Sequence, residues 1–241
     1  MKKVGLGVLP LLLFGCGGSD DPQDGIVFPD GDGTSLSSCY NPTLNELGTE
    51  TITNISKKAG LAQPVNVQER EVVQAVVDYE GQSGVLEVRL YDDTPDNRTY
   101  VVVDESSQAV TTLGQFFEGE MITYKPSGLA YFYDLASGES RTQPTITVYT
   151  DGVETGTMDV KMKYEKRETV TVPAGTFETC LVTLEIMLVD DGQESNALYK
   201  TNFGIGNGIA IRDELTASSN GTTLTTVDEL ISGTINGEPI Q

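Results

Sequence analysis

The sequence contains no histidine and no tryptophan among its 241 residues. Without histidine, the chain cannot build a Ser-His-Asp triad, a Cys-His dyad or an imidazole zinc site. The nucleophile patterns G-x-S-x-G and S-x-x-K and the redox pattern C-x-x-C are also missing. We therefore predict no catalytic residue, no metal ligand and no cofactor, and we expect a protein that is not an enzyme.

Positive charge is scarce as well. The chain has 15 Lys and Arg against 36 Asp and Glu, a formal net charge of −21. Such a surface repels phosphate backbones, which excludes nucleic acid as a partner. Most of the acids alternate with apolar positions or sit in turns, a pattern that marks solvated faces. A carboxylate-dependent hydrolase stays an alternative, because so many acids make a close pair easy to form, but the sequence does not locate one.

The N-terminus has the features of an export signal. Lys2 and Lys3 precede an apolar run at 4–14, which is too short to cross a bilayer as a helix. The tetrad Leu13–Cys16 resembles the lipobox of bacterial lipoproteins. This resemblance implies cleavage before Cys16 and three acyl chains at the new N-terminus, which would hold the protein permanently on a membrane. Gly17, in place of Asp, resembles the sorting signal for the outer membrane.

These features divide the chain into a lipoprotein signal peptide at 1–15, the lipidated cysteine with a flexible acidic linker at 16–38, and one β domain at 39–241. The linker is rich in Gly, Asp, Ser and Pro. If Cys16 carries lipid, Cys39 and Cys180 remain as a candidate disulfide pair in an oxidising compartment. The alternative is that Cys180 is a small buried hydrophobe of its strand.

The stretch from Thr169 to Asp213 has the clearest strand pattern. Its even positions from Cys180 to Leu188 are all apolar, while Thr183 and Glu185 mark the opposite face. A similar alternation at 158–165, and a hairpin formed by 70–79 and 85–91, extend the pattern to other parts of the chain. With turn signals every 8–12 residues and no convincing helical repeat, we predict an all-β fold, an antiparallel meander forming a β-sandwich or a strongly curled half-barrel.

Turn residues support this interpretation. Asp151-Gly152, Asn220-Gly221 and Asn236-Gly237 are typical of type I′ hairpin turns. The glycines of 204–208 lack the G-x-G-x-x-G spacing and precede a strand rather than a helix, so we predict a loop or bulge there and no nucleotide site.

Aromatic residues concentrate in the middle of the chain. In a curled sheet, such side chains could line a pocket for an apolar ligand. Ordinary core packing is the alternative, and because Tyr131 and Tyr133 share one strand face while Phe132 has the other, only part of the set could face one cavity. The candidate ligand-lining residues are Phe117, Tyr124, Tyr131 and Tyr133.

The run Val172–Phe177 with Cys180, followed by Gly206–Ala210, resembles a group of β-rich bacterial periplasmic lipoproteins of unknown function. The resemblance covers about residues 165–215 and implies a fold, not an activity. Our leading hypothesis is a non-enzymatic outer-membrane lipoprotein that meets the membrane through its N-terminal lipid and binds an apolar small molecule or an envelope protein. The alternative is a surface interaction module that uses acidic loops such as Asp92–Asn97.

Overall fold

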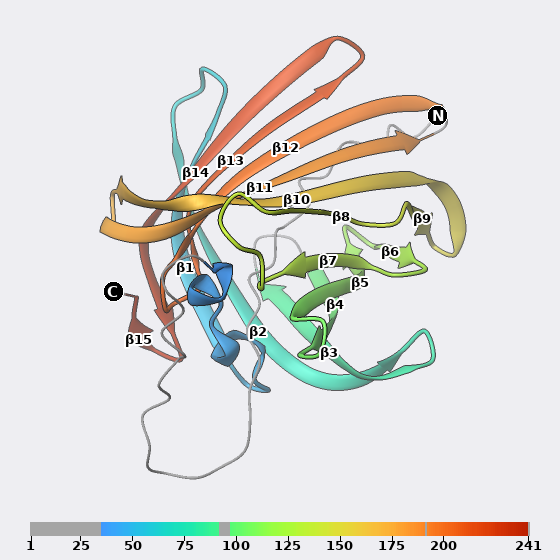
Figure 1. The fold of residues 1–241 in the computed structure, drawn as a ribbon, viewed down its shortest axis with the longest axis horizontal. Helices are drawn as coiled ribbons and strands as arrows, with labels where there is room; N and C mark the ends of the chain where they lie inside the picture. Colours follow the sequence, from blue (N-terminus) through green and yellow to red (C-terminus); the bar gives the residue numbers. More distant parts are fainter. Residues whose placement is uncertain (1–34, 92–96, 191, 241) are drawn as a thin grey trace.

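The computed structural model describes residues 35–91, 97–190 and 192–240, and it confirms the all-β, antiparallel prediction (Figure 1). Two short 3-10 helices, η1 at Leu36–Cys39 and η2 at Pro42–Asn45, precede the strands. None of the helices in these ranges is long and apolar enough to span a membrane. The strands are β1 Glu50–Ala59, β2 Val65–Tyr79, β3 Gln82–Tyr91, β4 Asn97–Asp104, β5 Ala109–Phe117, β6 Glu120–Lys125, β7 Leu129–Phe132, β8 Ser140–Thr142, β9 Ile146–Thr150, β10 Val153–Val172, β11 Gly175–Asp190, β12 Gln193–Gly204, β13 Ala210–Ser219, β14 Thr222–Ile235 and β15 Glu238–Pro239.

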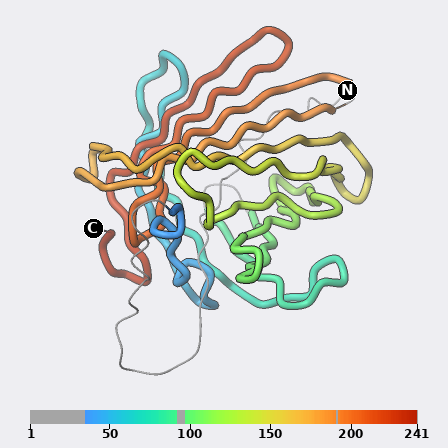
Figure 2. The backbone as a smooth tube through the Cα atoms, in the orientation of Figure 1, coloured from blue at the N-terminus to red at the C-terminus, as the bar shows by residue number. Residues whose placement is uncertain are grey.

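The sheet closes on itself. Its strands follow one another from β1 to β6, continue through β9 and run on to β14, which pairs with β1. This last pairing joins Thr51 to Ile235 and Ala59 to Thr226, on the left side of Figures 1 and 2. The predicted half-barrel would leave two edges unpaired, whereas the ring satisfies both, because the hydrogen-bonding groups of β1 and β14 face each other.

The longest strands form where alternation is strongest. In β10 and β11 the residues Met158, Val160, Met162 and Tyr164 pair with Leu188, Ile186, Leu184 and Val182, and their side chains point into the ring. The residues between them point outward, as the pattern predicted.

The hairpin turns also agree with the sequence. Asp151 and Gly152 have φ angles of 51° and 77°, and Asn220 and Gly221 have φ angles of 51° and 76°. Positive values at both central positions define the type I′ turn, which matches the twist of the adjoining strands.

Two clusters of buried side chains pack inside the ring. One cluster lies against β10–β12 and includes Tyr164, Cys180 and Phe203, and a second lies against β2–β5 around Val101. The segments at 36–40 and 131–135 lie between the two clusters. Leu36 and Leu135 belong to the first, and their backbones are joined by a hydrogen bond of 2.9 Å.

Candidate functional site

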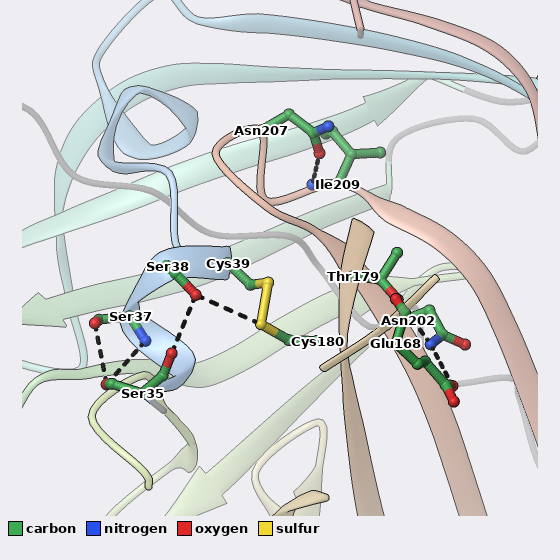
Figure 3. Close-up of a disulfide and its surroundings, with 10 residues drawn as sticks. All are labelled: Ser35, Ser37, Ser38, Cys39, Glu168, Thr179, Cys180, Asn202, Asn207 and Ile209. Atoms are coloured by element: carbon green, nitrogen blue, oxygen red, sulfur yellow. Dashed lines mark hydrogen bonds between the residues drawn. A yellow bond between two sulfur atoms is a disulfide. The ribbon is translucent and has the colours of Figure 1, made fainter. Parts of the chain in front are cut away.

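A disulfide between Cys39 and Cys180 joins the N-terminal segment to the centre of β11, and its Cα atoms are 6.1 Å apart (Figure 3). Both cysteines are buried. Ser35 caps η1 and places Ser38 beside the bond, where its hydroxyl lies 3.7 Å from Sγ of Cys180. The bond therefore ties this segment covalently to β11, in addition to the core packing of Leu36 and its hydrogen bond to Leu135.

The glycine-rich loop at 205–209 lies against the same segment. The amide of Gly206 donates to the carbonyl of Ser38 at 2.9 Å, and Asn41 donates through Nδ2 to the carbonyl of Asn207 at 3.1 Å. Gly208 has a φ of 70°, and a Cβ atom there would lie 3.0 Å from Cβ of Asn41. The sequence predicted a loop or bulge here, and the structure shows a loop whose backbone lies in close contact with the N-terminal segment.

The four candidate ligand-lining residues lie in different surroundings. Tyr131 packs against both core clusters and meets the ring of Phe203 edge to face at 5.4 Å, while Tyr133 stacks on Tyr40 at 3.8 Å. Tyr124 is buried in the first cluster. Phe117 lines a recess of about 10 Å³, which is the size of one water molecule. The three tyrosines therefore pack within the core of the ring.

A group of charged side chains lies on the inner face of β13, β14, β1 and β2. The ammonium of Lys57 contacts Glu69 at 2.7 Å and Asp228 at 3.5 Å. Asp213 is the cross-strand neighbour of Asp228 and accepts a hydrogen bond from Thr201, a buried residue that lies between two core aromatics on β12. Charged residues therefore line this part of the ring's inner face.

The surroundings change the acidity of this group. Burial raises the pKa of Asp213 to about 6, and the nearby Asp228 carboxylate acts in the same direction. Burial, and then the charge of Glu69, raise the pKa of Glu71 to about 8. For Lys57, burial alone would lower the pKa, but Glu69 and Asp228 outweigh it and raise the value. Perturbed acidity of this kind is common at functional sites and also in structural ion pairs.

The sequence reasoning placed such acids on solvated faces, and for this inner group it was wrong. The signal that could have identified them is strand parity. Asp213 stands between Ile211 and Leu215 at a spacing of two, so it shares the buried face of its strand. Glu69 and Glu71 have the same relation to Val73.

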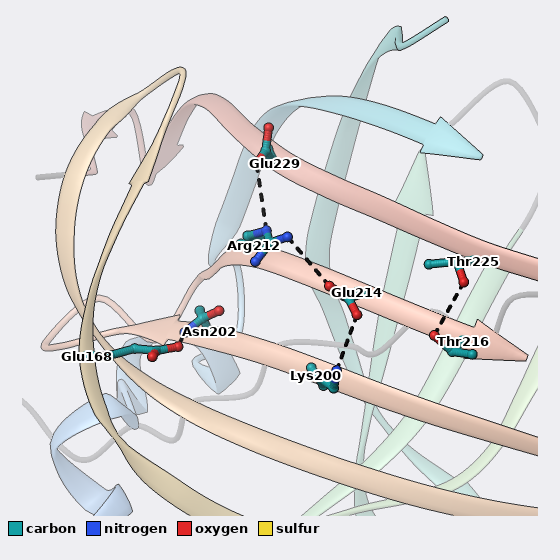
Figure 4. A network of polar contacts seen from close by, with 8 residues as sticks. All are labelled: Glu168, Lys200, Asn202, Arg212, Glu214, Thr216, Thr225 and Glu229. Atoms are coloured by element: carbon teal, nitrogen blue, oxygen red, sulfur yellow. Dashed lines mark hydrogen bonds and ion pairs between the residues drawn. The ribbon is translucent and has the colours of Figure 1, made fainter. Parts of the chain in front are cut away.

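The outer face of β12–β14 carries an ordinary polar network (Figure 4). Glu214 contacts Lys200 at 3.3 Å and Arg212 at 3.5 Å, and Arg212 reaches Glu229 at 3.6 Å. These pairs are partly exposed, so each contributes little to stability. They show that this side of the sheet faces solvent.

An open groove of about 460 Å³ crosses the outer face of β10–β13. Met187 and Leu198 are both half-buried there, and Asp159, Lys161 and Glu185 also line it. The Lys161 ammonium lies 3.8 Å from the Glu185 carboxylate, so the groove offers charges of both signs beside an apolar surface. Pockets of about 300–1,000 Å³ suit small molecules.

Several predictions fall outside the described residues. Cys16, the signal at 1–15 and most of the linker lie there, as does the acidic loop at 92–96. Within the ranges that the structure covers, no three His, Cys, Asp or Glu side chains group as a metal ion would require.

Comparisons with known proteins give a limited result. No family model matches the chain, and no curated protein matches it. Among solved structures, a candidate lipoprotein of Parabacteroides distasonis is 14% identical, with a TM-score of 0.39, over 79% of this chain and 96% of its own. The hypothetical lipoprotein YmcC of Escherichia coli K12 is 9% identical, with a TM-score of 0.39, over 76% and 83%. A candidate exported protein of Bacteroides fragilis with a YmcC-like fold is 14% identical, with a TM-score of 0.37, over 82% and 97%.

Proposed function

We propose that this chain is a non-enzymatic lipoprotein of the bacterial cell envelope that binds an amphipathic small molecule on the outer face of its ring. The groove across β10–β13 carries this proposal, because it combines a suitable volume with an apolar surface and a few charged groups. The ligand class follows from the lining. Met187 and Leu198 suit an apolar body, and Lys161 with Glu185 suits a polar end.

The anchor is the second part of the proposal. The tetrad Leu13–Cys16 supports lipidation of Cys16, and Gly17 supports delivery to the outer membrane. Mass spectrometry of the N-terminal peptide from membrane-extracted protein tests it directly. We expect cleavage before Cys16 and a mass increase from acyl chains, both absent in Cys16→Ser. An unmodified cysteine would contradict the anchor and leave ligand binding to its own test.

Ligand binding is tested by native mass spectrometry of the full chain, with organic extraction of whatever copurifies. We expect a defined small molecule at close to one per chain, and we expect Leu198→Glu to lose most of it. Val153→Glu is the matched control, because Val153 is also an exposed apolar strand residue and lies outside the groove. A ligand-free mass, or equal retention in both variants, would contradict the proposal.

The inner charged group supports a second candidate, a carboxylate-dependent hydrolase. Its one favourable observation is that Asp213, with its pKa raised to about 6, lies beside Asp228 and could hold a proton near neutral pH. Hydrolysis of glycan or ester substrates by the wild type, lost in Asp213→Asn, would support this candidate. Activity that survives Asp213→Asn would reject it.

A further inference from the structure

The tip of the β1–β2 hairpin exposes several apolar side chains, although the protein as a whole is strongly acidic. Leu61 is fully exposed, and Val65 has 62% of its surface open to solvent. Ala62 and Pro64 between them are exposed as well. A single exposed leucine is common on protein surfaces, but several exposed apolar side chains grouped at one tip are typical of an interaction surface.

A second hairpin meets this tip and adds to it. The amide of Gly60 donates to the carbonyl of Thr225 on β14 at 2.8 Å, and Ala59 pairs with Thr226. Leu224 is next to Thr225 in the chain and has 52% of its surface exposed. In Figure 1 the two hairpins project from the same upper side of the ring. We call Leu61, Ala62, Pro64, Val65 and Leu224 the apolar tip.

Charge separates the apolar tip from the rest of the protein. No Asp or Glu occurs at 51–68 or at 215–227, although the chain contains 36 of them. The charged residues of these stretches are Lys57 and Lys58. Lys57 is neutralised by Glu69 and Asp228 on the inner face, whereas Lys58 is exposed. The tip therefore presents apolar side chains and a cation with no carboxylate of its own.

Other exposed apolar side chains lack this combination. Val153 lies between Asp151 and Glu154, and Leu47 follows Glu46 directly. A carboxylate so close would be repelled by an anionic lipid surface and costly to dehydrate. These positions are therefore suitable controls for any property that depends on the apolar tip.

We propose that the apolar tip inserts into the headgroup region of a bilayer that contains anionic lipid, with Lys58 at the level of the phosphates. A membrane interface accepts a small, protruding apolar loop and attracts lysine beside it. A stable protein partner would instead need about 800 Å² on each side, and a convex hairpin tip of a few side chains does not offer such a surface. This contact goes beyond ligand binding and would orient the ring on the membrane.

The absence of tryptophan from the chain allows a direct test. In Leu61→Trp, reconstituted as the full chain in vesicles of phosphatidylethanolamine and phosphatidylglycerol, the single indole reports on the tip alone. We expect its emission to shift to the blue and to be quenched by lipids brominated along their acyl chains. Val153→Trp, the matched control, should show neither effect. Equal behaviour of the two variants would overturn the proposal.

The contribution of Lys58 and of anionic lipid is tested separately. Adding Lys58→Glu to Leu61→Trp should reduce the quenched fraction several-fold, as should vesicles of phosphatidylcholine alone. Chains that float with the vesicles without quenching would show an anchor and no docking, which rejects this inference and leaves the proposed lipid on Cys16 intact. A blue shift that grows with protein concentration in the absence of vesicles would assign the tip to self-association and overturn the lipid assignment.

Discussion

The inner face of the ring has two sides that differ in chemistry. Along β10–β12 it is apolar, with Met162, Tyr164 and Cys180 almost completely buried and a disulfide in their midst. Along β13, β14, β1 and β2 the same face carries a lysine among four carboxylates, two of which have strongly raised pKa values. The first side stabilises the fold by burial and a covalent bond. The second holds more carboxylates than cations, so its stability depends on which of them are protonated, and it should respond to pH where the first does not.

Removal of the disulfide should cause the largest loss in the free energy of unfolding. In Cys39→Ala/Cys180→Ala the unfolded chain regains the freedom of a loop that spans 141 positions, which corresponds to about 5 kcal/mol in the chain-entropy model. Urea unfolding at neutral pH measures the loss. A change below ~1 kcal/mol would show that residual structure in the unfolded chain already holds the two segments together.

Truncation of a buried side chain on the apolar side should cause the next largest loss of stability. Met162→Ala leaves a cavity in a completely buried position, and such changes cost about 2–5 kcal/mol. Met187→Ala, on the half-buried outer face, is the matched control and should cost less. Equal losses in urea unfolding would mean that the inner and outer faces of β10 and β11 are packed alike.

On the charged side, we expect Lys57→Met to cost about 1–3 kcal/mol, because Glu69 and Asp228 would then share the inner face without a cation. The pair is about one-third exposed, so solvent screening keeps the loss below that of a fully buried pair. Lys161→Met breaks an outer-face pair with Glu185 and should cost less than ~1 kcal/mol. Urea unfolding measures both losses of stability. A larger loss for Lys161→Met than for Lys57→Met would contradict this prediction.

A further effect should depend on pH. The Glu71 carboxyl, whose pKa is raised from 4.5 to about 8, stays neutral in the folded protein while the unfolded chain ionises. Stability is therefore lost as pH rises through that window, and Glu71→Gln should prevent the loss. We expect the variant to melt a few degrees above the wild type at pH 8 and close to it at pH 4, by thermal unfolding. A constant difference across that range contradicts the assignment.

The sequence predicted the fold more fully than the chemistry. Alternation from Cys180 to Leu188 and the type I′ turn at Asp151-Gly152 are local signals, and the structure contains both. Closure of the ring was not predicted, because the pairing of Thr51 with Ile235 joins the two ends of the domain and leaves no local trace. Local patterns define strands, whereas long-range pairing defines the shape.

The candidate sites show the same limit. Tyr131 lies in β7, whereas Tyr133 follows the end of that strand, so the prediction that both share one strand face was wrong. The side chains that pack against them come partly from the distant segment at 36–40. The groove lies on the outer face, where Met187 and Leu198 come from different strands and become neighbours only through the register of β11 with β12. The alternation of β13 predicts that Asp213 faces inward, because it lies two residues from both Ile211 and Leu215.

Closure of the ring also depends on the order in which the strands are synthesised. β1 precedes the other strands in the chain, yet its partner β14 follows twelve strands later than β2. Until that partner exists, β1 has an unpaired edge that can join other chains. Contacts of such long range make folding slow, on the scale of milliseconds to seconds. A chaperone that shields the N-terminal strands should therefore raise the yield of this protein more than one that acts after synthesis is complete.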